Sequence, residues 1–445
     1  MQEGETWLIL SHAFNMDGRA ASQTITDKIP HLIARGVTPI VISSATGSRD
    51  RVVEHHQLLP VSAAGLRFDL RHVVGRYTTN KAVYKAAVGL IALPLLPFYL
   101  LERTFIRLEA QWSWFIPAYL RGARLIRRRR CSVIYSTGGA WSAHLAGYLL
   151  AQKFSLPWVA EIHDPMVSRN PNHHRGMRSR LLAWLEAKIC ARADVPIWFV
   201  ETALAQAKRR NPSLGERGRV LIPGADRPSF GKIPYKRGAE LSIGHFGSLG
   251  LAGRNLAVFL AALESILRRR PELAKVIRLE LYGSDVDSVS AEAIAAFPFA
   301  DIVRPFGRLQ RDPVSGESGR DRVLKRMQTV DALLLLHGVG PDCEEYIPSK
   351  LYEYLWTERP IIGLVVNNPQ LDRLLREAGH WAVPATDVAA LAAVLAELIA
   401  RWEADELGDS GKPSPYTPGA AVDQIIGWVD EARAARREAR MELSP

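Results

Sequence analysis

Short apolar runs alternate along the chain with longer stretches in which apolar positions recur every three to four residues. The short runs are typical of strands buried in a parallel sheet, and the longer pattern is typical of amphipathic helices. In the first half, strands are predicted at residues 6–10, 37–42, 133–135, 158–162 and 197–200, and helices at 20–35, 141–153 and 178–191. In the second half, strands are predicted at 241–246, 279–282, 302–306, 332–336 and 361–365, and helices at 256–270, 322–327, 349–356, 371–377 and 389–404.

A stretch rich in proline and glycine, residues 222–237, separates the two series. Strands that alternate with helices predict parallel sheets with helices on both faces. The fold class is therefore α/β, with two Rossmann-like domains facing a cleft, in residues 1–225 and 226–415. Residues 416–445 become helical after three prolines, and we expect that helix to pack back on the first domain. Ligands of such sheets bind beyond the carboxyl ends of the strands.

One apolar segment, residues 86–101, has no charged residue. It is shorter than the ~20 residues of a membrane span, and Pro94 and Pro97 interrupt it. An interior helical pair is one interpretation. The other is a surface that rests in a membrane interface, because Lys85 and Arg103 flank the segment and Trp112 follows. We favour the interface and extend it over residues 86–120.

The charge and the cysteine content indicate which partners and which cellular compartment to expect. The chain has 445 residues and a net charge of +11, and the positive excess lies in residues 1–225. A basic half favours an anionic partner, and an anionic membrane is preferred to nucleic acid because no recognition motif accompanies the charge. Three cysteines without a C-x-x-C pair suit a reducing compartment. The first residues do not resemble a signal peptide, so we expect a cytoplasmic protein, peripheral to the inner face of the cell membrane.

Two glutamates, Glu345 and Glu353, flank the start of the predicted helix after strand 332–336. Pro348 suits a first helical turn, and the free N–H groups there form an anion site. A carboxylate beside a bound diphosphate can accept hydrogen bonds from ribose hydroxyls. The alternative is a capped surface helix with solvated glutamates and a pair between Lys350 and Glu353.

The motif and its neighbours resemble the retaining glycosyltransferases of family 4, which have the two-domain GT-B fold. The glutamates match that family's E-x7-E motif, and P-S-K-L-Y-E-Y-L at 348–355 followed by Arg-Pro at 359–360 matches its surroundings. Weaker matches follow in the family's order: G-R-A-A at 18–21, E-I-H-D-P at 161–165, G-H-F-G at 244–247, L-Y-G at 281–283 and V-R-P-F-G at 303–307.

The resemblance implies a role for each matching residue on the donor side. Glu345 would contact the donor sugar near its anomeric carbon, and Glu353 would hold the ribose. The N–H groups of Ser349 and Lys350 would bind the diphosphate together with Arg254. The family's second basic residue is replaced by Ser248. Three glycines would complete the nucleotide-sugar site: Gly18, Gly247 and Gly307.

On the acceptor side the resemblance points to His163 and Asp164, although a strand-end cap is the other interpretation of this pair. The family works without a metal or other cofactor, and we expect none; the His173–His174 pair is more typical of a solvated loop. The implied reaction moves a sugar from a nucleotide-sugar donor to an acceptor that we expect to be a lipid-linked glycan, with retention, in polysaccharide synthesis. Same-face transfer assisted by the leaving phosphate is the favoured route.

Two alternative functions share this fold: a nucleotide-sugar epimerase, and a membrane-bound scaffold without activity. An epimerase would need further carboxylates in the cleft and no membrane-facing segment. The intact glutamates argue against a scaffold.

Overall fold

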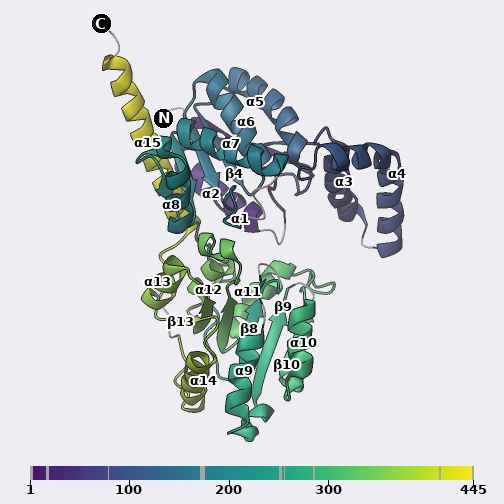
Figure 1. The fold of residues 1–445 in the computed structure, drawn as a ribbon, viewed down its shortest axis with the longest axis vertical. Coiled ribbons are helices and arrows are strands. Elements are labelled where there is room, and N and C mark those ends of the chain that lie inside the picture. The colour runs from purple at the N-terminus through teal and green to yellow at the C-terminus, as the bar shows by residue number, and fades with distance from the viewer. Residues whose placement is uncertain are drawn as a thin grey trace. The chain divides into compact units, whose positions relative to one another are not determined.

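The computed structural model describes residues 4–16, 20–78, 80–170, 176–249, 253–254, 256–283, 286–409 and 412–442. The chain divides into two compact units, one of Met1–Pro223 with Pro418–Pro445 and one of Gly224–Thr417. We call them unit 1 and unit 2. Each contains one parallel sheet with helices around it (Figure 1).

The sheet of unit 1 has seven strands in the order β3-β2-β1-β4-β5-β6-β7. These are β1 (Glu5–Leu10), β2 (Val37–Ser44), β3 (Glu54–Leu58), β4 (Val133–Gly138), β5 (Trp158–Ile162), β6 (Val195–Trp198) and β7 (Arg219–Val220). The chain runs outward from β1 to β3 and then returns to add β4 on the other side of β1, so the order reverses between β1 and β4. Loops after β1 and β4 therefore diverge at one edge and leave room for a ligand.

Helices cover this sheet and close its core. They are α1 (Ala20–Thr26), α2 (Ile29–Ala34), α5 (Phe115–Arg129), α6 (Trp141–Phe154), α7 (Met177–Arg192), α8 (Glu201–Arg210) and α15 (Pro418–Glu442). The single helix predicted over residues 20–35 is wrong: α2 starts anew, with Pro30 in its first turn. The last helix, α15, buries Val422, Ile425 and Val429 in the same core as strands β1 and β4.

The predicted membrane segment forms a helical hairpin of α3 (Ala63–Tyr77) and α4 (Lys81–Phe105) (Figure 1). Asn80 caps α4, which continues through Pro94 and Pro97. No residue of α4 is buried, so the interior interpretation is wrong. The chain-breaking effect assigned to the prolines is also wrong, because the helix loses single hydrogen bonds there without ending. Helix α4 has 25 residues and is long and apolar enough to cross a membrane, judged by length and composition alone.

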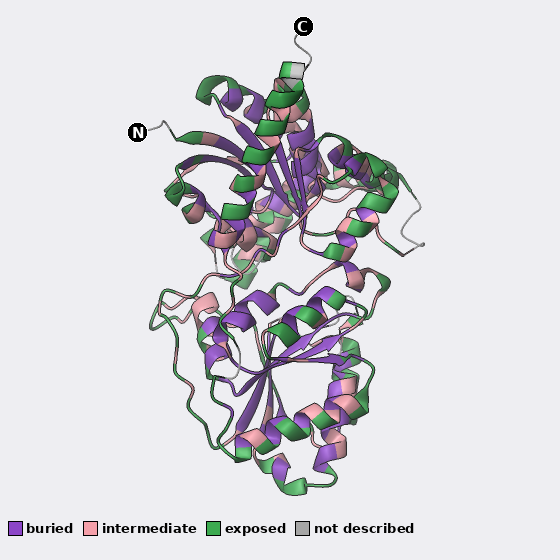
Figure 2. Cartoon of the chain, turned by 90° about the vertical axis from the view of Figure 1, so that its left-hand side faces the viewer, coloured by how far each residue is buried: buried purple, intermediate pink, exposed green. Residues whose placement is uncertain are grey.

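Unit 2 has a six-stranded sheet in the order β10-β9-β8-β11-β12-β13. Its strands are β8 (Leu241–Phe246), β9 (Ile277–Tyr282), β10 (Val303–Gly307), β11 (Ala332–Leu336), β12 (Ile361–Val365) and β13 (Trp381–Pro384). Its helices are α9 (Ala257–Leu267), α10 (Ser288–Ala296), α11 (Gly319–Thr329), α12 (Lys350–Thr357), α13 (Pro369–Glu377) and α14 (Val388–Glu403). Burial is concentrated in the strands and the helix faces turned toward them (Figure 2). The strand order reverses between β8 and β11.

Candidate functional site

In unit 2 the candidate residues gather where the strand order reverses. Arg254 lies in the loop after β8, and Glu345 lies in the loop after β11. Neighbouring parallel strands end at the same edge of the sheet, so both loops lie beyond the carboxyl ends of β8 and β11.

Tyr346 joins these two loops. Its hydroxyl accepts hydrogen bonds from the backbone N–H of Gly338 at 3.1 Å and from Nη2 of Arg254 at 3.3 Å. The Arg254 guanidinium lies 5.4 Å from the centre of the Tyr346 ring. Asn368 donates to the carbonyl oxygen of Tyr346 at 2.9 Å. Glu345, the next residue, is buried at the end of the 3-10 helix η7 (Pro341–Glu345). Tyr346 therefore holds the loop after β11 against Arg254 of the loop after β8.

Glu353 and Lys350 lie in the first turn of α12. Lys350 Nζ donates to a carboxylate oxygen of Glu353 at 2.6 Å, and a terminal nitrogen of Arg320 lies 3.7 Å from the other oxygen. The alternative interpretation expected a solvated glutamate here, yet only 7% of Glu353 is exposed. Helix α11 packs against α12 and covers that side. The pair named above as the alternative is thus present, at a helix end whose Ser349 forms no side-chain cap.

A cavity of about 290 Å³ opens at the carboxyl ends of β8, β9 and β10. Tyr282 and Phe306 stack there with ring centres 4.9 Å apart, and Phe246 stacks on the other face of Tyr282 at 4.7 Å. Phe306 is half exposed. An exposed aromatic face beside a small cavity can receive a planar ring.

Glycines shape the rim of this cavity, and Gly247 and Gly307 both line it. Gly307 has a φ of +65°. Gly283 has a φ of +133°, and a Cβ there would lie 2.3 Å from the carbonyl oxygen of Gly247. Only glycine permits this backbone conformation and this close approach. Gly18 lies outside the described residues, so the structure does not place it.

Two buried histidines border the same edge. His245 lines the cavity, and Nδ1 of its ring lies 3.0 Å from the carbonyl oxygen of Leu334. Burial lowers the pKa of His245 to about 4, and burial likewise lowers the pKa of His337 to about 4. Both rings are therefore neutral near pH 7, and the positive charge at this edge comes from arginine and lysine side chains, among them Arg254, Lys350 and Arg320.

In unit 1, His163 follows β5 and lies beside a fully buried glutamate, Glu161. The Nε2 atom of His163 is 2.9 Å from Glu161 Oε1 and 3.0 Å from Thr137 Oγ1. Its ring stacks on Phe199, with ring centres 4.6 Å apart. Asp164 is exposed beside the end of β4, where a Cβ on Gly139 would lie 3.0 Å from its carboxylate. The structure thus brings His163 and Asp164 to one edge of the sheet, where Glu161, Thr137 and Phe199 hold the His163 ring in place.

Glu161 is held by a second set of partners. Lys28, also fully buried, forms an ion pair with it, and the Tyr135 hydroxyl donates to it at 2.6 Å. Burial alone would raise the pKa of Glu161, but the charge of Lys28 and the contact with His163 outweigh burial and hold that pKa well below its usual range. Sequence reasoning missed Lys28, because a lysine between two helices carries no signal of burial.

No group of three or more His, Cys, Asp or Glu side chains among the described residues could hold a metal ion. His173 and His174 lie outside the described residues. Tyr346 was also missed as a site residue: its neighbours in the motif drew attention, but a tyrosine between two loops is recognised only once the loops are in place.

Comparison with solved structures identifies the architecture. TarM aligns with a TM-score of 0.62 at 8% identity, over 96% of this chain and 99% of that one. WaaG, a glycosyltransferase involved in lipopolysaccharide biosynthesis, aligns at 0.54 and 13% identity, over 96% and 94%. HepE of Anabaena, in complex with UDP-glucose, aligns at 0.52 and 11% identity, over 97% and 99%. This chain has the GT-B fold.

Sequence comparison adds nothing to this result. No family model matches the chain, and no curated protein matches it. At 8–13% identity the structural likeness establishes the fold, and with it the predicted pair of Rossmann-like domains. It does not establish that the chain belongs to family 4.

Proposed function

We propose that this protein is a retaining glycosyltransferase that moves a sugar from a nucleotide-sugar donor to a lipid-linked glycan acceptor in cell-surface polysaccharide synthesis. The main support is the arrangement at the reversal point of unit 2. A helix start with a buried carboxylate, an arginine held by Tyr346 and an aromatic-walled cavity lie at one sheet edge. A nucleoside diphosphate sugar offers a ribose for the carboxylate, a diphosphate for the helix start and the arginine, and a planar base for the cavity.

The donor lies along this edge with its base against Phe306, in the cavity bordered by Gly247 and Gly307. Glu353 accepts hydrogen bonds from the ribose, in place of the bond it now receives from Lys350. The freed Lys350, Arg254 and the N–H groups of Ser349 and Lys350 receive the diphosphate. Lys350 thereby supplies the charge that Ser248 lacks.

Transfer breaks the bond between the anomeric carbon and the diphosphate oxygen and forms a bond from that carbon to the acceptor oxygen. The acceptor proton passes to the leaving phosphate on the same face, which retains the configuration. Positive charge held at the diphosphate stabilises the leaving group as its negative charge grows. Glu345 contacts the sugar near the anomeric carbon. In unit 1, His163 and Asp164 orient the acceptor hydroxyl.

A panel of nucleotide sugars, assayed for hydrolysis and for transfer, tests the reaction. Glu345→Ala should lower turnover by about 100-fold or more while nucleoside diphosphate binding stays within about twofold, because a transition-state contact is lost. Glu272→Gln, an exposed change on the same unit, is the control. Full activity of Glu345→Ala, or epimerised sugar as the product of the unaltered protein, would refute the proposal.

The membrane partner is tested separately. We infer that α4 rests on the anionic inner face of the cell membrane, since Leu93, Phe98 and Leu101 are each more than half exposed on an apolar helix with basic flanks. Changing these three residues to Gln should abolish the salt-resistant part of binding to anionic vesicles and leave the thermal melt unchanged. Val52→Gln, at another exposed apolar position of unit 1, should change neither. Vesicle binding that survives the triple change would count against this surface.

A further inference from the structure

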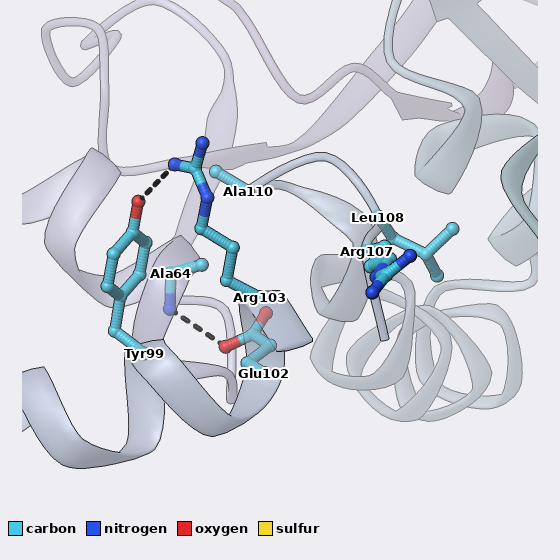
Figure 3. Close-up of a pocket in the computed structure, with 7 residues that line it drawn as sticks. All are labelled: Ala64, Tyr99, Glu102, Arg103, Arg107, Leu108 and Ala110. Atoms are coloured by element: carbon cyan, nitrogen blue, oxygen red, sulfur yellow. Dashed lines mark hydrogen bonds between the residues drawn. The ribbon is translucent and has the colours of Figure 1, made fainter. Parts of the chain in front are cut away.

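A second cavity, of about 520 Å³, lies in unit 1 at the base of the α3–α4 hairpin. The last turns of α4, the first turn of α3 and the loop over residues 106–111 enclose it (Figure 3). Its volume falls within the range of small-ligand pockets. Among the residues that the structure describes, no candidate donor or acceptor residue lines it.

The charge of this cavity is positive. Arg103 and Arg107 line it, and Arg103 donates to the Tyr99 hydroxyl at 2.9 Å. The Arg67 guanidinium lies over the Tyr99 ring at 4.9 Å. Arg107 uses Nε to donate to the carbonyl of Thr104 at 3.0 Å, so its two terminal nitrogens are not spent in that bond.

The carboxylate that lines the cavity, Glu102, is already engaged by structure. One oxygen accepts from the backbone N–H of Ala64 at 3.0 Å (Figure 3), and the other accepts from the indole N–H of Trp112. Glu102 therefore ties α4 to α3 and to the following loop. The arginines retain their charge for an anion, and their planar donors suit a phosphate.

The cavity adjoins an exposed apolar face of α4. Leu96 lies one helical turn before Tyr99 and Leu100 one turn before Arg103, and these two leucines are 41% and 54% exposed. A ligand that fills the cavity with a phosphate and covers this face with an apolar chain satisfies both surfaces. A free phosphate or a nucleotide would satisfy only the first.

The loop that closes the cavity is tied to the acceptor edge of the sheet. Glu109 in this loop accepts from the Trp141 indole at 2.9 Å and forms an ion pair with Arg178. Trp141 begins α6, directly after the end of β4, where Gly139 lies against the carboxylate of Asp164. The loop beside the cavity is thus hydrogen-bonded to the start of α6, which lies close to Asp164 within the same unit.

We propose that this cavity binds the phosphate group of the lipid carrier that bears the acceptor glycan. The inference rests on the proposed function and adds the site at which the lipid acceptor is held. The apolar chain lies along α4, and Arg103 and Arg107 grip the phosphate. The glycan then extends from the phosphate toward the edge that carries His163 and Asp164.

Binding of geranyl phosphate, compared with geraniol and with inorganic phosphate, tests the site by calorimetry on the full chain. The phosphate ester should bind at least tenfold more tightly than either part alone. Arg103→Gln and Arg107→Gln should each weaken it about tenfold, because each removes a charge-assisted bond. Arg103→Lys should keep part of the affinity. Arg128→Gln, an exposed change on α5, should leave it intact.

Three results would overturn the assignment. The first is binding of geraniol as tight as that of its phosphate, and the second is a loss of binding in Arg128→Gln as large as that in the cavity variants. In the third, the cavity variants lose binding to phosphatidylglycerol vesicles yet bind geranyl phosphate normally, which assigns the arginines to bulk headgroups. A thermal melt of each variant verifies folding, and Arg103→Lys keeps the test decisive if a Gln variant unfolds. Failure of nucleotide-sugar hydrolysis with geranyl phosphate binding intact would refute the proposed reaction and leave the lipid-phosphate site standing.

Discussion

Two lysine–glutamate pairs, one in each unit, have the same chemistry and opposite settings. Lys28 and Glu161 are both fully buried, and Glu161 also contacts Tyr135, Thr137 and His163. The side chain of Lys350 is 36% exposed, and its partner Glu353 stands at a helix start. The buried pair is surrounded by further hydrogen-bonding side chains, whereas Lys350 is partly exposed and, in the proposed function, the second pair exchanges its partner for a ligand. The surroundings of a lysine–glutamate pair therefore decide whether it stabilises the fold or is available for binding. Three measurements test this difference between the two pairs.

The largest effect is expected at the buried pair. Lys28→Met leaves the carboxylate of Glu161 buried without its cation, which should lower the free energy of unfolding by about 3–5 kcal/mol. Lys350→Met should lower it by less than about 1 kcal/mol, because that pair is partly exposed to solvent. Urea denaturation measures both. Equal losses from the two changes would remove the distinction between the pairs.

The exchangeable pair should show its effect in binding. Glu353→Gln should weaken nucleoside diphosphate binding about tenfold to a hundredfold, because a charged acceptor of ribose hydroxyls is lost. The thermal melt should stay nearly constant. Calorimetry with the free nucleotide gives the affinity, and Glu272→Gln serves as the control. Unchanged affinity would return Glu353 to the role of a surface ion pair.

The smallest effect is a dependence on pH. The pKa of Glu161 is held well below its usual range in the folded chain, chiefly against burial by the charge of Lys28. Its stabilising contribution is complete above the unfolded pKa of about 4.3 and is lost as the pH falls toward the folded value. Between those two pKa values the free energy of unfolding should drop by up to about 1.4 kcal/mol for each unit by which the pH falls, from this group alone.

Unfolding measured between pH 5 and pH 3 checks this slope. The double variant Lys28→Met/Glu161→Met carries neither charge and should lose that part of the slope. A slope that is identical in the variant would mean that other carboxylates cause the acid sensitivity of unit 1.

Much of the fold could be predicted from the sequence, because a parallel strand that is buried on both faces consists of a short run of apolar residues. Strands β5, β8, β11 and β12 lie at the predicted residues. Strands β3, β7 and β13 were missed: β3 reads Glu-His-His-Gln-Leu, β7 has only two residues and β13 only four. All three lie at an edge of their sheet, where pairing with the neighbouring strand supplies what a longer apolar run does not.

Helix α4 shows that an apolar sequence pattern does not by itself predict whether a helix is buried. Its apolar composition was plain, and so was that of α9, yet α9 buries six residues in the core of unit 2 and α4 buries none. Apolar side chains leave water in either case, and the pattern is the same whether the partner is a sheet or a membrane. Only the folded chain shows that no sheet covers α4.

The sequence by itself determined the alternation of strands and helices, the two-domain division of the α/β fold and the glutamates at the start of α12, because these depend on residues near one another in the chain. The tertiary structure decided which distant residues meet. It placed Tyr346 against Arg254 across 92 positions and Lys28 against Glu161 across 133. It also left the apolar face of α4 uncovered beside two arginines. Such contacts arise from packing, whose energy depends on the neighbours that the whole fold brings together.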